Sequence, residues 1–203
     1  MANTLLPAAP DGMPRCNWCL ATPLYVSYHD NEWGFPVGQD QRLFEKLCLE
    51  GFQSGLSWLT ILNKRENFRA GFAGFDFHKL AQFGEADVER LLQDAGIVRH
   101  RGKIEAVINN AKRAIEMVEA EGSLAAFFWR YAPKNESTGT DIQAQTAESL
   151  ALSKELKKRG WKFVGPTTMY ALMQAMGMVN DHAPGCTTRA AVDKARKAFK
   201  LPK

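Results

Sequence analysis

The chain has 203 residues, of which 45% are hydrophobic and 24% are charged, and its formal net charge is +4. This composition is typical of a globular domain and excludes fibrous and strongly charged disordered chains. No apolar run approaches the about 20 residues that span a bilayer, and the N-terminus lacks the basic flank and apolar core of a signal peptide. We therefore expect a cytoplasmic protein without a membrane segment, whose four cysteines are thiols or metal ligands rather than a disulfide framework.

The first half of the chain contains three helical patterns. Residues 1–14 precede them; they are small, Pro-rich and patternless, and we predict that they are disordered. Apolar residues recur at helical spacing from Arg42, with Gly51 near the stop. Asp87 is a candidate cap of a second helix, which Gly96 ends. The longest periodic run follows: Ile104, Val107, Ile108, Ala111, Ile115 and Val118.

The second half predicts three more helices. Ser123 can cap a helix over 124–131, and residues 132–145 have the composition of a loop. A helix over 149–158 carries basic residues in its last turn and is followed by glycine, and Pro166 suits the first turn of a helix that runs to about Met176. Strand signals are weak and no internal repeat is evident. The predicted fold class is all-α, with two helical lobes and a cleft between them.

The stretch "VNDHAPGC" places His182 and Cys186 four residues apart in a turn. Cys16 and His29 near the other end of the chain would complete a Cys2His2 zinc set, and four protein ligands leave no open position, so such an ion would be structural. Spacing alone favours this site no more than buried thiols and satisfied core histidines. Cys19 also forms a CxxC pair with Cys16, which can bind metal or act as a redox couple.

A second group combines aromatic residues with one acid. The segments "PLYVSYHDNEWG" and "CLEGFQSGLSWLTIL" supply Tyr25, Tyr28, Trp33, Glu50, Gln53 and Trp58. Ring faces, one carboxylate and one amide suit a pocket for a flat heterocycle, because the rings stack on it and the polar groups bind its edge. A Trp- and Tyr-rich core with Glu50 at its rim is the alternative, and the residues alone favour it.

The basic residues gather near the C-terminus. Residues 154–203 hold 11 Lys or Arg against 3 Asp or Glu, whereas the remainder holds 15 against 19. Within this region "LKKRGWKFVGPTTMY" is a candidate helix–hairpin–helix, whose glycine turn and new helix N-terminus suit a DNA phosphate. The candidate DNA-binding residues here are Lys158, Arg159, Lys162 and Gly165. An ordinary αα-hairpin and a solvated charged tail are the alternatives.

Together, "YHDNEWG", "LCLEGFQSGLSW", "KRENFR", "LLQDAGIVRHRGKI" and "MGMVNDH" strongly resemble the bacterial 3-methyladenine DNA glycosylase I family, a zinc-containing branch of the helix–hairpin–helix glycosylases. The resemblance covers about residues 15–186, which makes this the expected glycosylase domain and leaves 187–203 as a basic tail. It implies a monomeric enzyme that acts on double-stranded alkylated DNA. It further implies one structural zinc on Cys16, His29, His182 and Cys186.

The same resemblance implies roles for the aromatic and acidic residues. Glu50, Tyr28 and Trp58 would line the base pocket, with Trp18, Tyr25 and Gln53 beside them, and Glu50 would serve recognition first and catalysis second. Gly55 and Leu56 are candidates for the element that fills the gap in the DNA, although Leu56 can equally be core. Thr167 stands where lyase-competent relatives carry a nucleophilic lysine, so we expect a monofunctional enzyme that leaves an abasic site.

Asp181 follows the hairpin at the distance where many such enzymes carry an acid that stabilises the sugar cation. It also adjoins a predicted zinc ligand, and we expect it to orient the turn or His182. Three other functions stay open: a zinc-stapled DNA-binding module without chemistry, a zinc-dependent hydrolase, and a CxxC thiol enzyme.

Overall fold

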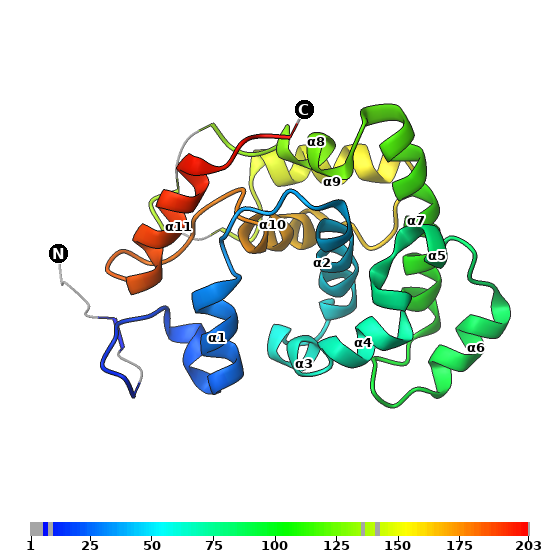
Figure 1. The fold of residues 1–203 in the computed structure, drawn as a ribbon, viewed down its shortest axis with the longest axis horizontal. Coiled ribbons are helices and arrows are strands. Elements are labelled where there is room, and N and C mark those ends of the chain that lie inside the picture. The colour runs from blue at the N-terminus through cyan, green and yellow to red at the C-terminus, as the bar shows by residue number, and fades with distance from the viewer. Residues whose placement is uncertain (1–5, 8–9, 135–136, 141–142, 203) are drawn as a thin grey trace.

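The computed structural model describes residues 6–7, 10–134, 137–140 and 143–202, and every regular element in these ranges is a helix (Figure 1). The predicted all-α class is therefore confirmed for the part of the chain that the structure describes. The first half contains the 3-10 helix η1 (Asn17–Ala21), α1 (Pro23–Asn31), α2 (Asp40–Gln53), α3 (Trp58–Asn63), α4 (Arg65–Gly71), η2 (Ala73–Phe75), α5 (Phe77–Leu80) and α6 (Glu85–Gln93). The second half contains α7 (Arg101–Glu121), α8 (Leu124–Trp129), α9 (Ala147–Lys158), α10 (Pro166–Ala175) and α11 (Thr187–Ala198).

The capping residues show how closely the local sequence specifies these helices. The Ser123 hydroxyl accepts the Ala126 N–H at 2.9 Å and begins α8, as predicted, and Pro166 is the first residue of α10. The prediction for Asp87 is wrong by three residues, because α6 begins at Glu85. The Asp87 carboxylate instead reaches back from the first turn to the Gly84 N–H at 3.1 Å. An acidic side chain in that position still stabilises the helix N-terminus.

Helix α2 lies at the centre of the molecule and packs against α10, α7 and α8 (Figure 1). Its apolar residues, among them Phe44 and Leu47, are fully buried. At its C-terminal end the ring of Phe52 contacts Phe68 of α4, with 4.6 Å between ring centroids. Burial of a large aromatic ring contributes about 1.5–3 kcal/mol, so this packing fixes α2 firmly. The polar side chains of the helix are held in place by the same core.

The turn between α9 and α10 is attached to α7 by two asparagines. Asn110 accepts the Lys162 N–H at 2.8 Å and donates to the Lys162 carbonyl at 2.9 Å, and Asn109 donates to the carbonyl of Gly160 at 2.9 Å. Gly160 has a φ of 82°, in the left-handed region that glycine adopts without strain. The hairpin is therefore a fixed part of the fold rather than a free loop.

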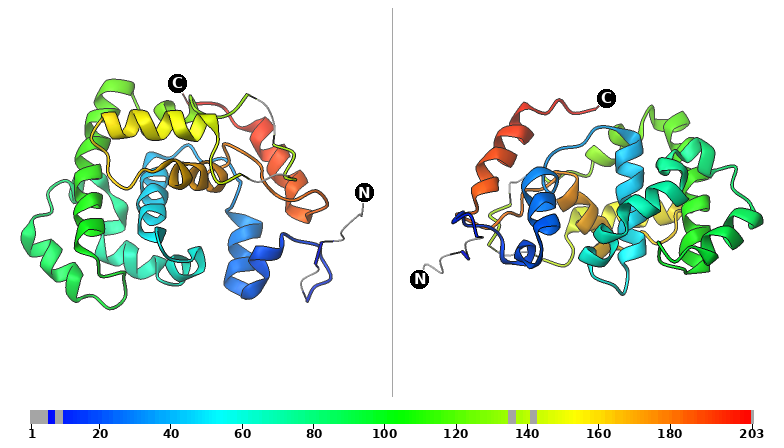
Figure 2. Two further views of the ribbon diagram at one scale, coloured as in Figure 1. Left: turned by 180° about the vertical axis from the view of Figure 1, so that it is seen from behind. Right: turned by 60° about the horizontal axis from the view of Figure 1, so that its bottom comes forward.

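The two ends of the described chain lie against each other. The Thr187 N–H and hydroxyl both donate to the Pro14 carbonyl at 3.0 Å, and the Ala183 N–H points at the Cys16 sulfur at 3.4 Å. Figure 2 shows the N-terminal segment beside the start of α11 in both views. Most of the predicted basic tail thus forms α11, after which the Phe199 ring packs against Trp129 at 4.6 Å.

Part of the predicted disordered extension, residues 1–5 and 8–9, lies outside the described residues, so its disorder stays a prediction. Within the described ranges, no helix has both the length and the apolar character that a membrane crossing requires.

Candidate functional site

A pocket of about 220 Å³ opens between α1, α2, α3 and α10. It brings together all six residues that the sequence analysis assigned to base binding: Trp18, Tyr25, Tyr28, Glu50, Gln53 and Trp58. Its remaining lining residues are Trp33, Lys46, Ala171 and Gln174. The pocket is the right size for one planar heterocycle, and its lining combines ring faces with a small number of polar groups.

The aromatic wall of the pocket is built by η1, α1 and α3. Thr22 caps α1 by accepting the Tyr25 N–H at 3.1 Å, and Tyr25 and Tyr28 are three residues apart, so both rings lie on one helix face. The ring centroids of Trp18 and Tyr25 are 4.9 Å apart, and those of Tyr28 and Trp58 are 5.5 Å apart. These rings contact one another edge-on or tilted, which fixes their orientation before a ligand arrives.

Glu50 is the acid of the pocket and is only 6% exposed. Its Oε1 accepts from the Lys46 ammonium at 2.8 Å, one helical turn earlier in α2. The side chains of Lys46 and Glu50 therefore form a buried ion pair within the pocket. The alternative interpretation, in which Glu50 lies at the rim of an aromatic core, does not describe this geometry.

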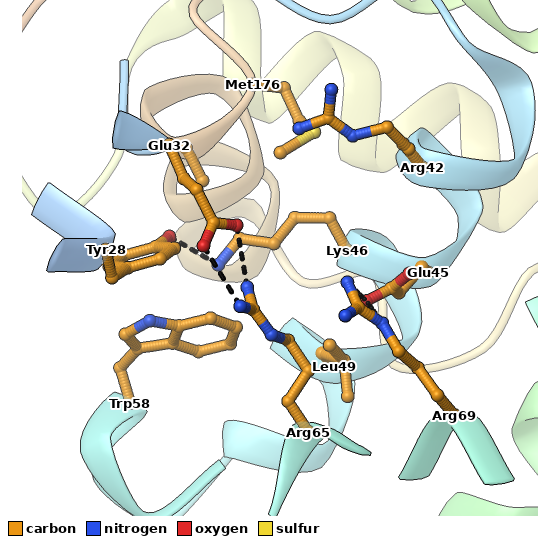
Figure 3. Close-up of a pocket in the computed structure, with 11 residues that line it drawn as sticks. Tyr28, Glu32, Arg42, Glu45, Lys46, Leu49, Trp58, Arg65, Arg69 and Met176 are labelled. Carbon is orange, nitrogen blue, oxygen red and sulfur yellow. Dashed lines mark hydrogen bonds and ion pairs between the residues drawn. The ribbon is translucent and has the colours of Figure 1, made fainter. Parts of the chain in front are cut away.

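Lys46 is the residue of the pocket that the sequence analysis missed. Its ammonium donates to the Tyr28 hydroxyl at 2.9 Å and lies 3.0 Å from the centroid of the Trp58 ring (Figure 3). Burial lowers the pKa of Lys46 to about 8, while the Glu50 carboxylate acts in the opposite direction. Burial also raises the pKa of Tyr28 well above its usual value, with Glu50 adding to the effect. The i, i+4 spacing of Lys46 and Glu50 was the available signal.

Gln174 of α10 is a second missed residue, and Asp181 explains its orientation. The buried Asp181 carboxylate accepts from Gln174 Nε2 at 2.9 Å, from the Tyr170 hydroxyl at 2.7 Å, and from the Ser137 hydroxyl. Asp181 does not line the pocket. Its oxygens accept from three donors, so Asp181 orients neighbouring side chains. One of these is the Gln174 amide of the pocket, whereas the sequence analysis expected Asp181 to orient the turn or His182.

The loop that links α2 to α3 borders the pocket. Gly55 has a φ of 80°, and Leu56 is 43% exposed, so the alternative that Leu56 belongs to the core is wrong. Both residues share a hollow with Thr167 and Thr168 at the start of α10. Lys103, also missed from the sequence, donates to the carbonyl oxygens of Phe52 at 2.9 Å and Ser54 at 2.7 Å, and so supports the loop from α7.

The predicted DNA-binding residues of the hairpin lie in three different settings. Gly165 directly precedes α10, whose first turn borders the hollow beside Leu56. Lys158 and Lys162 are exposed, and Lys158 lines a separate surface hollow. Arg159 is paired with Glu121 at 2.7 Å and with Glu155 at 2.8 Å, so its charge is already compensated within the protein.

Three of the four predicted zinc ligands meet at the junction of the chain ends. The side-chain ligand atoms of Cys16, His29 and Cys186 all lie within 4.8 Å of one another. His182 is next to them, with 4.7 Å between its ring centroid and that of His29, and its buried Nε2 has no hydrogen-bond partner among the described residues. Cys19 is not part of this group, because its thiol donates to the Cys16 carbonyl at 3.1 Å.

Burial and mutual contacts shift the pKa values of this group in different directions. Burial, with the nearby His29, lowers the pKa of His182 to about 4, so its imidazole is neutral. A hydrogen bond from the Cys16 thiol lowers the pKa of Cys186 strongly and raises that of Cys16. The other ring nitrogens are occupied, since His29 Nδ1 lies 2.7 Å from Asp30 and His182 Nδ1 lies 2.8 Å from Asn180. Cys48, in contrast, is a buried core thiol of α2.

Comparison with known proteins agrees with this arrangement. The family model described as methyladenine glycosylase matches residues 18–190. The chain is 52% identical over 179 residues to DNA-3-methyladenine glycosylase 1 of Escherichia coli K12, an alignment that covers 86% of this chain and 96% of that protein.

Solved structures show the same similarity. A crystal structure of 3-methyladenine DNA glycosylase I superimposes with a TM-score of 0.80 at 52% identity, covering 85% of this chain and 98% of the other. The Staphylococcus aureus 3-methyladenine DNA glycosylase I, whose structure concerns 3-methyladenine recognition, gives a TM-score of 0.81 at 35% identity over 86% of this chain and 96% of that one. The resemblance found in the sequence is confirmed, and the chain belongs to the methyladenine glycosylase family.

Proposed function

We propose that the pocket around Glu50 receives a methylated base that has left the DNA stack, and that the protein hydrolyses the bond between this base and its sugar. The observation that carries this proposal is the enclosure of one carboxylate, paired with a lysine, by five aromatic residues in a pocket of about 220 Å³. Phosphate binding alone requires no acidic pocket. The relatives named above are 3-methyladenine glycosylases, and the substrate is accordingly 3-methyladenine in alkylated double-stranded DNA.

The chemistry follows from the charge of the lesion. Methylation at N3 makes the adenine cationic while it is bound to the sugar, and it leaves as a neutral base when the electrons of the glycosidic bond move onto it. The bond is therefore weak and needs little acid catalysis. Water adds to the sugar carbon and loses a proton, which leaves an abasic site. The protein has to select the base and to stabilise the sugar cation that forms in the transition state.

Glu50 and the aromatic rings supply this selection. The carboxylate accepts hydrogen bonds from N–H groups of the base and attracts its positive charge, and a hydrogen bond to a charged group contributes about 1.5–3 kcal/mol. A cationic base stacked on an aromatic ring gains roughly 0.5–2 kcal/mol. Tyr28 and Gln174 present further hydrogen-bonding groups to the edge of the base.

Access to the base requires that the nucleotide rotate out of the duplex, at a cost of a few kcal/mol. Leu56 is the apolar wedge that occupies the gap, because it is exposed on a loop beside the pocket and Lys103 supports that loop from behind. The hairpin from α9 to α10 acts as the helix–hairpin–helix, with the first turn of α10 facing a DNA phosphate next to this wedge. Pocket, wedge and hairpin then form one DNA-facing cleft between two helical lobes.

A structural zinc ion fits the group at the chain ends. Tetrahedral bonds of about 2.3 Å to sulfur and 2.0–2.1 Å to nitrogen place these two ligand atoms about 3.6 Å apart. The Cys186 sulfur and His29 Nε2 are 3.5 Å apart, and the unpartnered Nε2 of His182 supplies a further donor. Cys16, His29, His182 and Cys186 would hold the ion. Because four protein ligands leave no open position, it would join the chain ends and support folding, which argues against a zinc-dependent hydrolase.

The direct test is incubation of the purified protein with methylated duplex DNA, followed by chromatography of the released bases and electrophoresis of the strand. Release of 3-methyladenine from DNA that stays intact until alkali cleaves the abasic site is expected of a monofunctional enzyme. DNA binding without base release would instead support a non-catalytic zinc-stapled module. Cys19→Ser tests the thiol alternative, and we expect it to release base at the wild-type rate.

A further inference from the structure

Lys46 is a buried lysine whose ammonium has several close partners in the base pocket. The residue is 5% exposed, and its ammonium contacts three pocket residues at once: Glu50 Oε1 at 2.8 Å, the Tyr28 hydroxyl at 2.9 Å and the Trp58 ring at 3.0 Å from its centroid. These come from α2, α1 and α3, so one cation joins three elements of the pocket. In Figure 3 the side chain runs from α2 to a position between the Tyr28 and Trp58 rings.

Lys46 also forms part of the boundary between two cavities. Together with Tyr28 and Trp58 it lines the base pocket and also a smaller hollow of about 50 Å³ on its other side. Across that hollow Arg65 makes two hydrogen bonds to Glu32, at 2.7 and 3.0 Å (Figure 3). The titratable groups that face the ammonium are Tyr28, Glu32, Glu50 and Arg65, and Arg42, Glu45 and Arg69 line the rest of the hollow.

The contacts of Lys46 determine what the pocket offers to a ligand. An ammonium has three donors and no acceptor, so the Tyr28 oxygen must accept from it, and the Tyr28 proton is directed elsewhere. One oxygen of Glu50 is engaged by the same ammonium, and no hydrogen bond to Glu50 Oε2 is present among the described residues. The site therefore presents one carboxylate oxygen and one hydroxyl proton in defined directions.

We propose that Lys46 is a positioning residue for base recognition, which orients both the Glu50 carboxylate and the Tyr28 hydroxyl toward the base while its ammonium covers one face of the Trp58 ring. This inference rests on the proposed function of the pocket.

The test is a set of variants measured for affinity to free 3-methyladenine between pH 5 and pH 9. Lys46→Met keeps the length of the side chain and removes its charge, Lys46→Gln keeps a donor without the charge, and Lys79→Met removes an exposed lysine of α5 as the matched control. Folding is checked by circular dichroism, and Lys46→Gln carries the test if Lys46→Met does not fold.

We expect both Lys46 variants to bind at least tenfold more weakly than wild type at pH 7, and Lys79→Met to bind normally. The ratio of variant to wild-type affinity should be constant between pH 5 and pH 7 and should rise above pH 8. Above pH 8 wild type itself should weaken as Lys46 loses its proton. A structural role alone would lower stability without this pH dependence.

Two results would overturn the inference. Equal affinity in the Lys46 variants would show that the ammonium does not position the site, and tighter binding would show that it competes with the base instead. Release of 3-methyladenine from methylated DNA by wild type is measured in parallel. If wild type releases no base, the proposed function fails, whereas if wild type is active and the variants match it, only the inference about Lys46 fails.

Discussion

Glu50→Gln tests the site most directly, because it removes a buried charge without changing the size of the side chain. Removal of one partner from a buried ion pair costs about 3–5 kcal/mol when the other charge stays buried. Lys46 can escape this cost by releasing its proton, since its pKa is already about 8 in the folded protein. Without Glu50, whose carboxylate raises the pKa of Lys46, this pKa falls below about 8, so the neutral amine is readily reached at pH 7. The variant should therefore lose about 1–2 kcal/mol of unfolding free energy and keep its fold.

The pKa of Lys46 also determines how the stability difference between wild type and Glu50→Gln changes with pH. Lys46 titrates near 8 in the folded protein and near 10.4 when unfolded, so raising the pH from 7 to 9 removes the ammonium from folded wild type as well. The difference in unfolding free energy between wild type and variant should thus shrink over this interval. Urea denaturation at pH 7, 8 and 9 measures it. A loss of 3 kcal/mol or more that persists at pH 9 would refute the argument.

The same variant should lose most of its recognition of the base. Loss of a hydrogen bond to a charged group, about 1.5–3 kcal/mol, predicts a drop of roughly 10- to 150-fold in affinity for free 3-methyladenine and in single-turnover release from DNA. Glu45→Gln is the matched control, because Glu45 lies on the same helix but pairs with Arg69, at 2.7 Å, outside the base pocket. Excision that is unchanged in Glu50→Gln would remove Glu50 from the site.

Three further predictions concern the DNA contact and the metal. Leu56→Ala should change the unfolding free energy by no more than about 0.5 kcal/mol, because the side chain is exposed. The variant should nevertheless release 3-methyladenine from duplex DNA about tenfold more slowly, at unchanged affinity for the free base. Equal rates of wild type and variant in single-turnover assays would argue against a wedge. Lys158→Ala should weaken DNA binding and lower the slope of log affinity against log salt concentration by about 1. Fluorescence anisotropy of labelled DNA measures this slope, and a slope equal to that of wild type would exclude this phosphate contact. Elemental analysis should find one zinc per chain. Removal of the zinc by a chelator should lower the melting temperature, while base release per folded molecule changes only later. Full thermal stability of the metal-free protein would contradict a structural ion.

Local patterns in the sequence predicted much of the architecture. The spacing of apolar residues from Ile104 to Val118 indicates α7, and the cap at Ser123 and the proline at 166 mark the starts of α8 and α10. Such signals act within one or two helical turns, so they are readable without the fold. The family-specific strings added the identity of the pocket residues, all of which line one cavity.

Helices α3 and α5 were not predicted, because their stability comes from packing. Helix α3 has six residues and α5 has four, which is too short to form alone, and each depends on burial against its neighbours. Helix α11 has a polar surface and docks through Val192 and Phe199. From the sequence alone this segment is interpreted as a basic tail, because the surface against which it packs comes from other parts of the chain.

The charges of the site required the tertiary structure. Lys46 and Arg159 are both basic helix residues, yet the fold encloses the first between two aromatic rings and a carboxylate, and pairs the second with two surface glutamates. What a charge does depends on the dielectric and the partners that folding supplies around it, and residues distant in the sequence provide both. The sequence by itself determined the helices with clear caps and apolar periodicity and the chemistry available, whereas only the packing of α1, α2 and α3 decided which cation would share the pocket with Glu50.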